Sequence, residues 1–148
     1  MRFLTPFLLC FIVVFVLDQA IKWFFVSTQY SYDGPIISLV LVYNKGVAFS
    51  MFAFLQDALK YIQIALLLGI FLYLLKNKEL LKAHIYPIGI IFGAGASNIL
   101  DRFMHEGVVD YIYWHYKFNF AVFNFADVMI NIGVAIILFQ VLFKKKSK

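Results

Sequence analysis

Cysteine and histidine are both scarce in this sequence, and their scarcity excludes several kinds of site. The only cysteine is Cys10, so an internal disulfide and a cysteine-based zinc site are excluded. The three histidines, His84, His105 and His115, are scattered, and the HExxH motif of zinc proteases does not occur. Repeats, linkers and low-complexity segments are also absent, so we expect a single domain over residues 1–148.

Charged residues are few as well. They make up 14% of the chain, whereas hydrophobic residues make up 64% and aromatic residues 20%. A soluble domain of 148 residues could not bury so much apolar surface, so this composition indicates a membrane protein. The excess of lysine and arginine that gives the net charge of +5 lies in short segments that flank hydrophobic runs, so we expect no nucleic-acid partner.

Hydrophobic runs of about the length needed to cross a bilayer, roughly 20 residues, occur at four places in the sequence. We expect membrane spans at residues 3–26, 58–75, 84–102 and 123–143. The first run follows Arg2, as the apolar part of a signal peptide would. It lacks an A-x-A cleavage site, so we expect it to remain in the protein.

The distribution of lysine and arginine predicts the orientation of these spans. If both termini and the loop at 76–82 lie on one side, that side carries eight of these cations and one acid, Glu79. The other side then carries five cations and seven acids. The positive-inside rule therefore predicts that both termini are cytoplasmic and that the segments 27–57 and 103–122 are extracytoplasmic.

The two extracytoplasmic segments differ from the spans. The β-branched run Ile36–Tyr43 is too short to span and predicts a strand, and Asn44-Lys45-Gly46 predicts a turn after it. Aromatic residues are frequent in 103–122, which is typical of a membrane interface. We therefore expect an all-α membrane protein with four transmembrane helices, a small extracytoplasmic β element and a short second segment on the outer face.

Polar residues inside the spans lie near the outer ends, at a similar depth on the first, third and fourth spans if each residue rises about 1.5 Å. They are Asp18 and Lys22, which are spaced to pair, then Asn98, Asp101 and Arg102 on one helical face, and Asn124, Asp127 and Asn131 on another. Asp101 is placed either to orient Arg102 or to pair with Lys22. In the interior of the second span only Gln63 is strongly polar, so we expect that span to be a packing wall.

The third span also carries small residues at every fourth position. They are Gly89, Gly93 and Ser97. Such a stripe allows the backbone of another helix to approach closely. We expect a neighbouring span to pack against it.

Two aspartates carry the main functional hypothesis. Asp127 begins an apolar run, where a carboxylate is costly and is functional by default, and Asp110 lies in the preceding outer segment. Two carboxylates brought together do not both ionise easily, so one keeps a proton while the other activates water. The pair therefore predicts an intramembrane aspartyl hydrolase.

Alternatives from other classes explain the sequence less well. A channel or proton-coupled transporter needs polar groups across the bilayer, whereas the polar groups here stop at the outer ends of the spans. A purely structural membrane protein would account for the spans but not for the two acids near asparagine and arginine. A rhomboid-type serine protease would need a Gly-x-Ser-Gly motif, which is absent.

Five motifs in order resemble those of the lipoprotein signal peptidases, the bacterial type II signal peptidases. They are Asp18-Gln19-Ala20-Ile21-Lys22, Asn44-Lys45-Gly46-Val47-Ala48-Phe49-Ser50, Ser97-Asn98-Ile99-Leu100-Asp101-Arg102, Gly107-Val108-Val109-Asp110 and Phe123-Asn124-Phe125-Ala126-Asp127. The resemblance covers nearly the whole chain. One departure is Ser97, where the family usually has glycine.

The resemblance implies an aspartic endopeptidase that removes the signal peptide from diacylglyceryl-modified prolipoproteins, cutting just before the lipidated cysteine. It implies the bacterial cytoplasmic (inner) membrane, with the site toward the outer leaflet. Partners would be the lipid-modified prolipoproteins and membrane lipids, with no cofactor, metal or obligate protein partner.

The resemblance also implies roles for individual residues. Asp110 and Asp127 would be catalytic. The substrate-binding or supporting residues would be Asn44, Gly46, Asn98, Arg102 and Asn124, with Asp18, Lys22 and Asp101 behind them.

Overall fold

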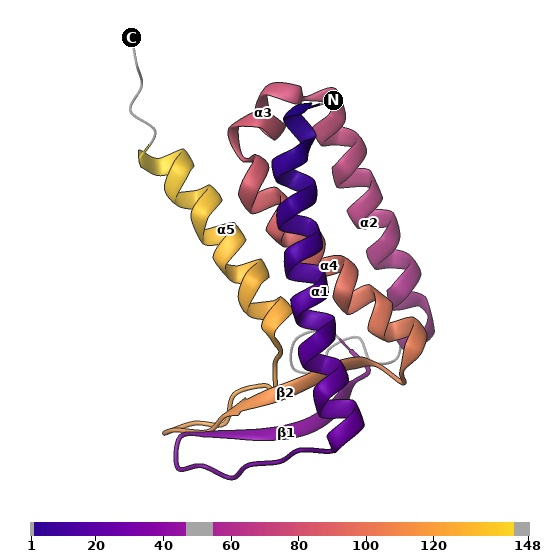
Figure 1. Cartoon of the computed structure of the whole chain (residues 1–148), viewed down its shortest axis with the longest axis vertical. Helices are drawn as coiled ribbons and strands as arrows, with labels where there is room; N and C mark the ends of the chain where they lie inside the picture. Colours follow the sequence, from indigo (N-terminus) through magenta and orange to yellow (C-terminus); the bar gives the residue numbers. More distant parts are fainter. Residues whose placement is uncertain (1, 47–54, 144–148) are drawn as a thin grey trace.

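Helices form most of the chain in this computed structural model, which describes residues 2–46 and 55–143 (Figure 1). The elements in chain order are η1 (Arg2–Leu4), α1 (Thr5–Thr28), β1 (Ile37–Asn44), α2 (Gln56–Lys76), α3 (Lys78–Ala83), α4 (Ile85–Met104), β2 (Val108–Trp114) and α5 (Phe125–Phe143). The mostly helical architecture with a small β element is the one that the sequence predicts.

Within the described residues, three helices are long and apolar enough to cross a membrane. They are α1, the part of α2 from Ala58 to Lys76, and α5. Their bounds match the expected first, second and fourth spans to within about two residues, which is the usual uncertainty of helix ends. Helix α4 is not among the three, because its last third carries several polar and charged residues, so a fourth span stays a prediction.

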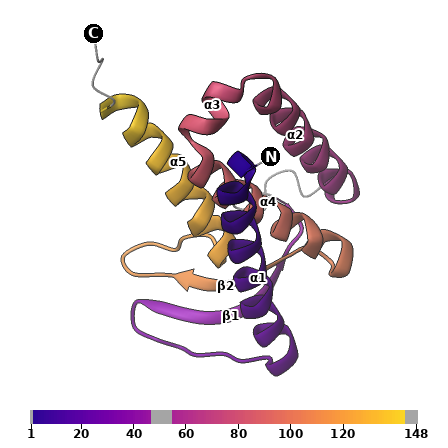
Figure 2. The ribbon, with the colours of Figure 1, turned by 45° about the horizontal axis from the view of Figure 1, so that its top comes forward.

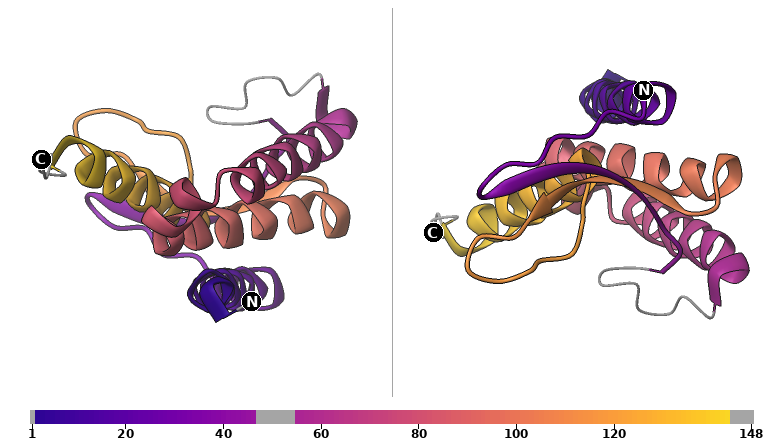
Figure 3. Two further views of the ribbon diagram at one scale, coloured as in Figure 1. Left: turned by 90° about the horizontal axis from the view of Figure 1, so that it is seen from above. Right: turned by 90° about the horizontal axis from the view of Figure 1, so that it is seen from below.

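The long helices run side by side, with the sheet at one end and the start of α1 and the end of α5, together with α3, at the other (Figure 1). The tilted view in Figure 2 shows α4 behind α1 and among the other helices. Seen along the bundle, α1 lies on one side of α4 and α2 on the other (Figure 3). Helix α4 is therefore the element on which the bundle is assembled.

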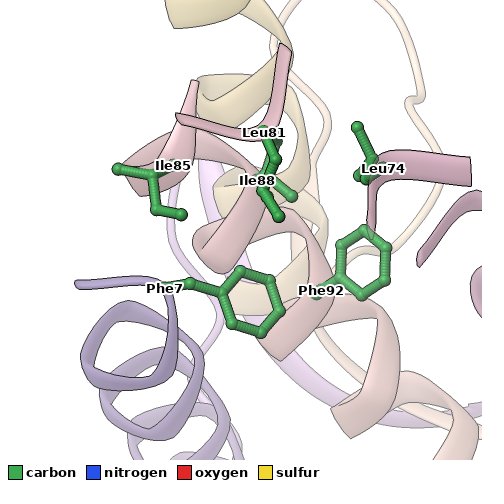
Figure 4. Close-up of a cluster of buried hydrophobic side chains, with 6 residues drawn as sticks. All are labelled: Phe7, Leu74, Leu81, Ile85, Ile88 and Phe92. Carbon is green, nitrogen blue, oxygen red and sulfur yellow. The ribbon is translucent and has the colours of Figure 1, made fainter. Parts of the chain in front are cut away.

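A buried apolar cluster joins the helices near the end of the bundle where α3 lies (Figure 4). It contains Phe7 from α1, Leu74 from α2, Leu81 from α3, and Ile85, Ile88 and Phe92 from α4. Leu81 is completely buried, and this burial explains why the segment 76–82, expected to be a loop, contains the short helix α3.

The stripe of small residues on α4 is where α1 packs. A Cβ atom added to Gly89 would lie 2.6 Å from the carbonyl oxygen of Phe7, and one added to Gly93 would lie 2.5 Å from that of Phe11. Only glycine leaves room for so close an approach. The expectation that another helix packs against this stripe is confirmed.

The sheet consists of β1 and β2, which pair in antiparallel fashion from Ile37 opposite Trp114 to Asn44 opposite Val108. The pairing is irregular between Leu39 and Val42. The strand expected at Ile36–Tyr43 is thus confirmed with a shift of one residue. The second outer segment, for which no strand position was predicted, supplies its partner strand, and this pairing brings β2 to the end of the helical bundle.

Candidate active site

Asp110 and Asp127 lie in the wall of one cavity of about 710 Å³. Asp110 is on β2 and is 1% exposed, and Asp127 is half-buried in the first turn of α5. The same cavity is lined by the expected residues Asn44, Gly46, Asn98 and Arg102. The structure therefore brings together residues that lie far apart in the sequence.

The start of α5 is held so that Asp127 has a fixed position. The Oδ1 atom of Asn124 accepts a hydrogen bond from the backbone N–H of Asp127 at 2.9 Å, and Oδ2 of Asp127 accepts one from the N–H of Asn124 at 3.2 Å. The backbone N–H of Phe125 donates to the Tyr111 hydroxyl, and the backbone N–H of Ala126 donates to Oδ1 of Asp18. This reciprocal capping satisfies N–H groups that a helix start leaves unpaired.

Three asparagine amides contact the two carboxylates. Asn44 donates to Oδ2 of Asp110 at 3.0 Å, and Asn124 donates to Oδ1 of Asp110 at 2.7 Å. Asn98 donates to Oδ1 of Asp127 at 3.0 Å. Asn124 also donates to Oδ1 of Asn98 at 3.1 Å, which links the two halves of the site. Both carboxylates are thus oriented by neutral donors.

The environment of Asp110 favours its protonated form. Burial raises the pKa of Asp110 to about 7, and the charge of Asp127 adds to the rise. The amides of Asn44 and Asn124 oppose the rise because they stabilise the ionised form. A carboxyl group with such a pKa exchanges its proton near neutral pH, which suits acid–base chemistry.

A buried ion cluster lies behind this site. The Nζ atom of Lys22 lies 2.6 Å from Asp18, 2.7 Å from Asp101 and 2.7 Å from Oδ1 of Asn98. Asp18, Lys22 and Asp101 are at most 2% exposed. Ser97 donates to Asp18 at 2.7 Å, so the serine that replaces the usual glycine belongs to this cluster. The expected pair of Asp18 and Lys22 is confirmed, and Asp101 pairs with Lys22.

Arg102 is also buried, at 8% exposed, but its contacts differ from those of Lys22. Its Nε donates to Oε1 of Gln63 at 3.0 Å, and its Nη2 donates to the carbonyl oxygen of Gly46. Within the described part of the chain, Nη1 is buried and has no hydrogen-bond partner. A buried charged donor without a partner is costly, so this atom is the expected contact point for an oxygen of a ligand.

A comparison with known protein families identifies the family of this chain. The family model for signal peptidase (SPase) II matches residues 10–143. This chain belongs to the signal peptidase II family. It is accordingly an aspartic-type peptidase, a hydrolase of the membrane.

Curated relatives share most of their length with this chain. A lipoprotein signal peptidase of Helicobacter acinonychis (strain Sheeba) is 55% identical over 138 residues, which cover 93% of this chain and 87% of the relative. One from Wolinella succinogenes is 54% identical over 136 residues, 92% of each chain. A bacterial membrane enzyme solved by the in meso method has a TM-score of 0.77 at 24% identity, over 96% of this chain and 92% of the other, and it shows the same fold.

One expectation about this family member is wrong. The second span was expected to be only a packing wall, but Gln63 of α2 lines the cavity and accepts a hydrogen bond from Arg102. The signal in the sequence was that Gln63 is the only strongly polar residue in the interior of its apolar run, where Lys60 lies near the start. An amide at that place finds a partner inside the protein, because lipid offers none.

Tyr111 is the second site residue that the sequence did not reveal. It lies among the aromatic residues interpreted as an interface belt, but it is 4% exposed and stacks on Phe25 with ring centroids 4.3 Å apart. Its hydroxyl accepts the hydrogen bond from the N–H of Phe125 at 3.0 Å. Tyr111 therefore supports the start of α5, and nothing in its sequence spacing distinguishes it from its exposed neighbours.

Two further expectations concern the motif at Asn44–Ser50 and the position of Asn131. The motif at Asn44–Ser50 is described only as far as Gly46, so Val47–Ser50 lie outside the described residues. Asn131, expected on the face of Asn124 and Asp127, is exposed, lines the cavity and donates to the carbonyl oxygen of Asp127 at 2.8 Å.

Across residues 2–46 and 55–143, histidine, cysteine and acidic side chains form no group of three that could hold a metal ion.

Proposed function

We propose that this chain removes the signal peptide from prolipoproteins by aspartyl hydrolysis, with Asp110 and Asp127 as the catalytic pair. The observation that carries the proposal is the arrangement of a buried carboxylate from β2 and a half-buried one from α5 in one cavity, each hydrogen-bonded to asparagine amides. Membership of the signal peptidase II family and relatives named lipoprotein signal peptidase support the substrate class.

The chemistry follows from the pair sharing one proton. The ionised carboxylate takes a proton from a water molecule as the water oxygen attacks the scissile carbonyl carbon. The protonated carboxyl donates a hydrogen bond to the developing oxyanion. When the carbon–nitrogen bond breaks, a proton passes from the pair to the leaving amine. The raised pKa of Asp110, about 7, supports the presence of one shared proton near neutral pH.

The supporting residues divide into two groups in this proposal. Asn98 and Asn124 hold the carboxylates, because their amides already donate to Asp127 and Asp110. Asn44 does the same for Asp110 from the end of β1. Arg102 instead presents an unpaired Nη1 and so binds a peptide carbonyl of the substrate.

The cavity extends from the pair along α5, where most of its lining is apolar. The apolar lining residues there are Val128, Ile130, Ile132 and Ala135, and Asn131 lies among them. An apolar wall next to the carboxylates suits a substrate whose reacting bond adjoins an apolar segment or acyl chains. We therefore propose that the substrate carries a diacylglyceryl group and is cut just before the lipidated cysteine.

The test of this proposal compares two forms of one prolipoprotein peptide, with and without the diacylglyceryl group on the cysteine. Binding energy from acyl chains, remote from the scissile bond, holds that bond against the carboxylates, so we expect the unlipidated peptide to have kcat/KM lower by about a hundredfold or more. Mass spectrometry of the products should locate the cut just before the cysteine. Equal cleavage of both peptides would refute lipid specificity but leave the aspartyl chemistry standing.

We also propose that α4 is a fourth span and that the protein lies in the bacterial inner membrane with both termini cytoplasmic. At about 1.5 Å per residue, the 20 residues of α4 extend about 30 Å, enough to cross the hydrocarbon core. The start of α1, the end of α5 and α3 lie at the end opposite the sheet (Figure 1), in agreement with the cation distribution. A reporter inserted near Lys78 should be cytoplasmic and one near Asp33 extracytoplasmic; a cytoplasmic Asp33 reporter would overturn this orientation.

A further inference from the structure

Among the α2 side chains that the structure describes, Gln63 is the one that lines the candidate active site. Residues Ala58–Lys76 are apolar enough to span a membrane, yet Gln63 lines the cavity that contains the two aspartates. The apolar contacts of α2 near the other end, such as the buried Leu74, already fix the helix in the bundle. A polar residue at this place therefore needs an explanation other than packing.

Arginine chemistry fixes the orientation of the Gln63 amide. The guanidinium group carries only donors, so Nε of Arg102 must face the oxygen of Gln63, and Oε1 accepts this bond at 3.0 Å. The Nε2 group of Gln63 then points away from Arg102, and it has no hydrogen-bond partner among the residues that the structure describes. Gln63 thus has one end bound to Arg102 and one end available in the cavity.

The guanidinium plane of Arg102 is held at two of its three nitrogen atoms. Gln63 accepts from Nε, and the carbonyl oxygen of Gly46 accepts from Nη2. Two fixed contacts determine the plane of a rigid group, so the unpaired Nη1 has a defined direction. Without Gln63, the guanidinium would be free to rotate about its remaining contact.

We infer that Gln63 is a positioning residue for substrate binding: it orients Arg102 toward a peptide carbonyl of the substrate and offers its own Nε2 to the same peptide segment. This inference rests on the proposed peptidase function and extends it to a residue of α2. The contact is made with a carbonyl away from the scissile bond, so it contributes to substrate affinity in the ground state and in the transition state alike. Its loss should therefore raise KM more than it lowers kcat.

The experiment uses the full-length protein in lipid nanodiscs and the diacylglyceryl peptide as probe, with three variants. Gln63→Met keeps the size but removes acceptor and donor, and Gln63→Glu keeps an acceptor for Arg102. Ile62→Met is the matched control, because Ile62 is 50% exposed and lies outside the cavity lining. We expect Gln63→Met to lower kcat/KM by roughly tenfold to a hundredfold, mainly through KM, since it removes a hydrogen bond to a charged group.

The other variants and the kinetic split decide between positioning and a merely structural role. Gln63→Glu keeps the acceptor for Arg102 but lacks the Nε2 donor, so it should recover part of the lost kcat/KM, and Ile62→Met should stay within about twofold of wild type. A variant that only unfolds more easily would show a lower kcat with KM unchanged, and this result for Gln63→Met would overturn the inference. So would wild-type kinetics for Gln63→Met, or equal losses in both Gln63 variants. Absence of cleavage by the wild-type protein would instead overturn the proposed function, and the inference with it.

Discussion

Replacement of either Asp110 or Asp127 by asparagine is expected to abolish cleavage, lowering the rate by about 10⁴-fold or more. Asparagine has nearly the shape of aspartate, but it cannot take a proton from water or return one to the leaving amine. The proposed pair has one proton to share, so the loss of either carboxyl removes both roles. Cleavage of the diacylglyceryl peptide, followed by mass spectrometry, measures the effect.

The control for this prediction is Asp33→Asn. Asp33 is an exposed acid of the proposed outer side that accepts a hydrogen bond from the hydroxyl of Ser38, and an asparagine oxygen can accept the same bond. This variant should retain activity. Substantial turnover by either purified dyad variant, with a thermal unfolding midpoint like that of wild type, would refute the aspartyl mechanism.

The pH dependence of the wild-type protein is a second readout of the same pair. The pKa of Asp110, raised to about 7, means that the shared proton is lost as the pH rises through this region. Activity should therefore fall above about pH 7, with an apparent pKa that belongs to the pair and not to one residue. A constant rate from about pH 6 to about pH 9 would contradict this assignment of the proton.

Local spacing in the sequence predicted several of these features correctly. Asp18 and Lys22 are four residues apart on a helix, and this spacing alone brings them into contact. Gly89 and Gly93 lie at the spacing that permits close helix packing, and α1 packs there. Features that depend on one element and its period were therefore accessible without coordinates.

Contacts between elements were less accessible. The position of the second strand was not predicted, because Val108–Asp110 are all buried and the alternation of buried and exposed residues that identifies a strand is absent. The bond from Arg102 to Gln63 joins two helices whose relative rotation no sequence spacing encodes. The bond from Asn98 to Asp127 likewise depends on how α4 and α5 pack. Motif resemblance supplied Asn98, Arg102 and Asp127 as a set, but it supplied neither Gln63 nor the hydrogen-bond partners of these residues.

Replacement of Lys22 by methionine is expected to destabilise the protein by about 3–5 kcal/mol, the usual effect of removing one partner from a buried ion pair. Lys22 is the cation shared by two fully buried carboxylates, Asp18 and Asp101, at 2.6 and 2.7 Å. Without it, each carboxyl must take up a proton or remain as an uncompensated charge. The midpoint of thermal unfolding in one detergent, compared with that of wild type, measures the effect.

The same substitution at an exposed lysine provides the control. Lys82 pairs with Glu79 at 3.3 Å, but both side chains are largely exposed, so Lys82→Met should change the unfolding midpoint little. The contrast separates the loss of a buried cation from the chemical change of lysine to methionine. Equal unfolding midpoints for Lys22→Met and wild type would contradict the proposed contribution of the ion cluster to stability.

A triple variant keeps the prediction testable if Lys22→Met does not fold. Combining Lys22→Met with Asp18→Asn and Asp101→Asn removes all three charges together, and replacing a whole buried ion cluster is less costly than breaking it. The triple variant should therefore be more stable than Lys22→Met alone. Its activity should remain low, because Lys22 also donates to Asn98, whose amide holds Asp127. A triple variant no more stable than the single one would show that packing, not charge, makes Lys22 necessary.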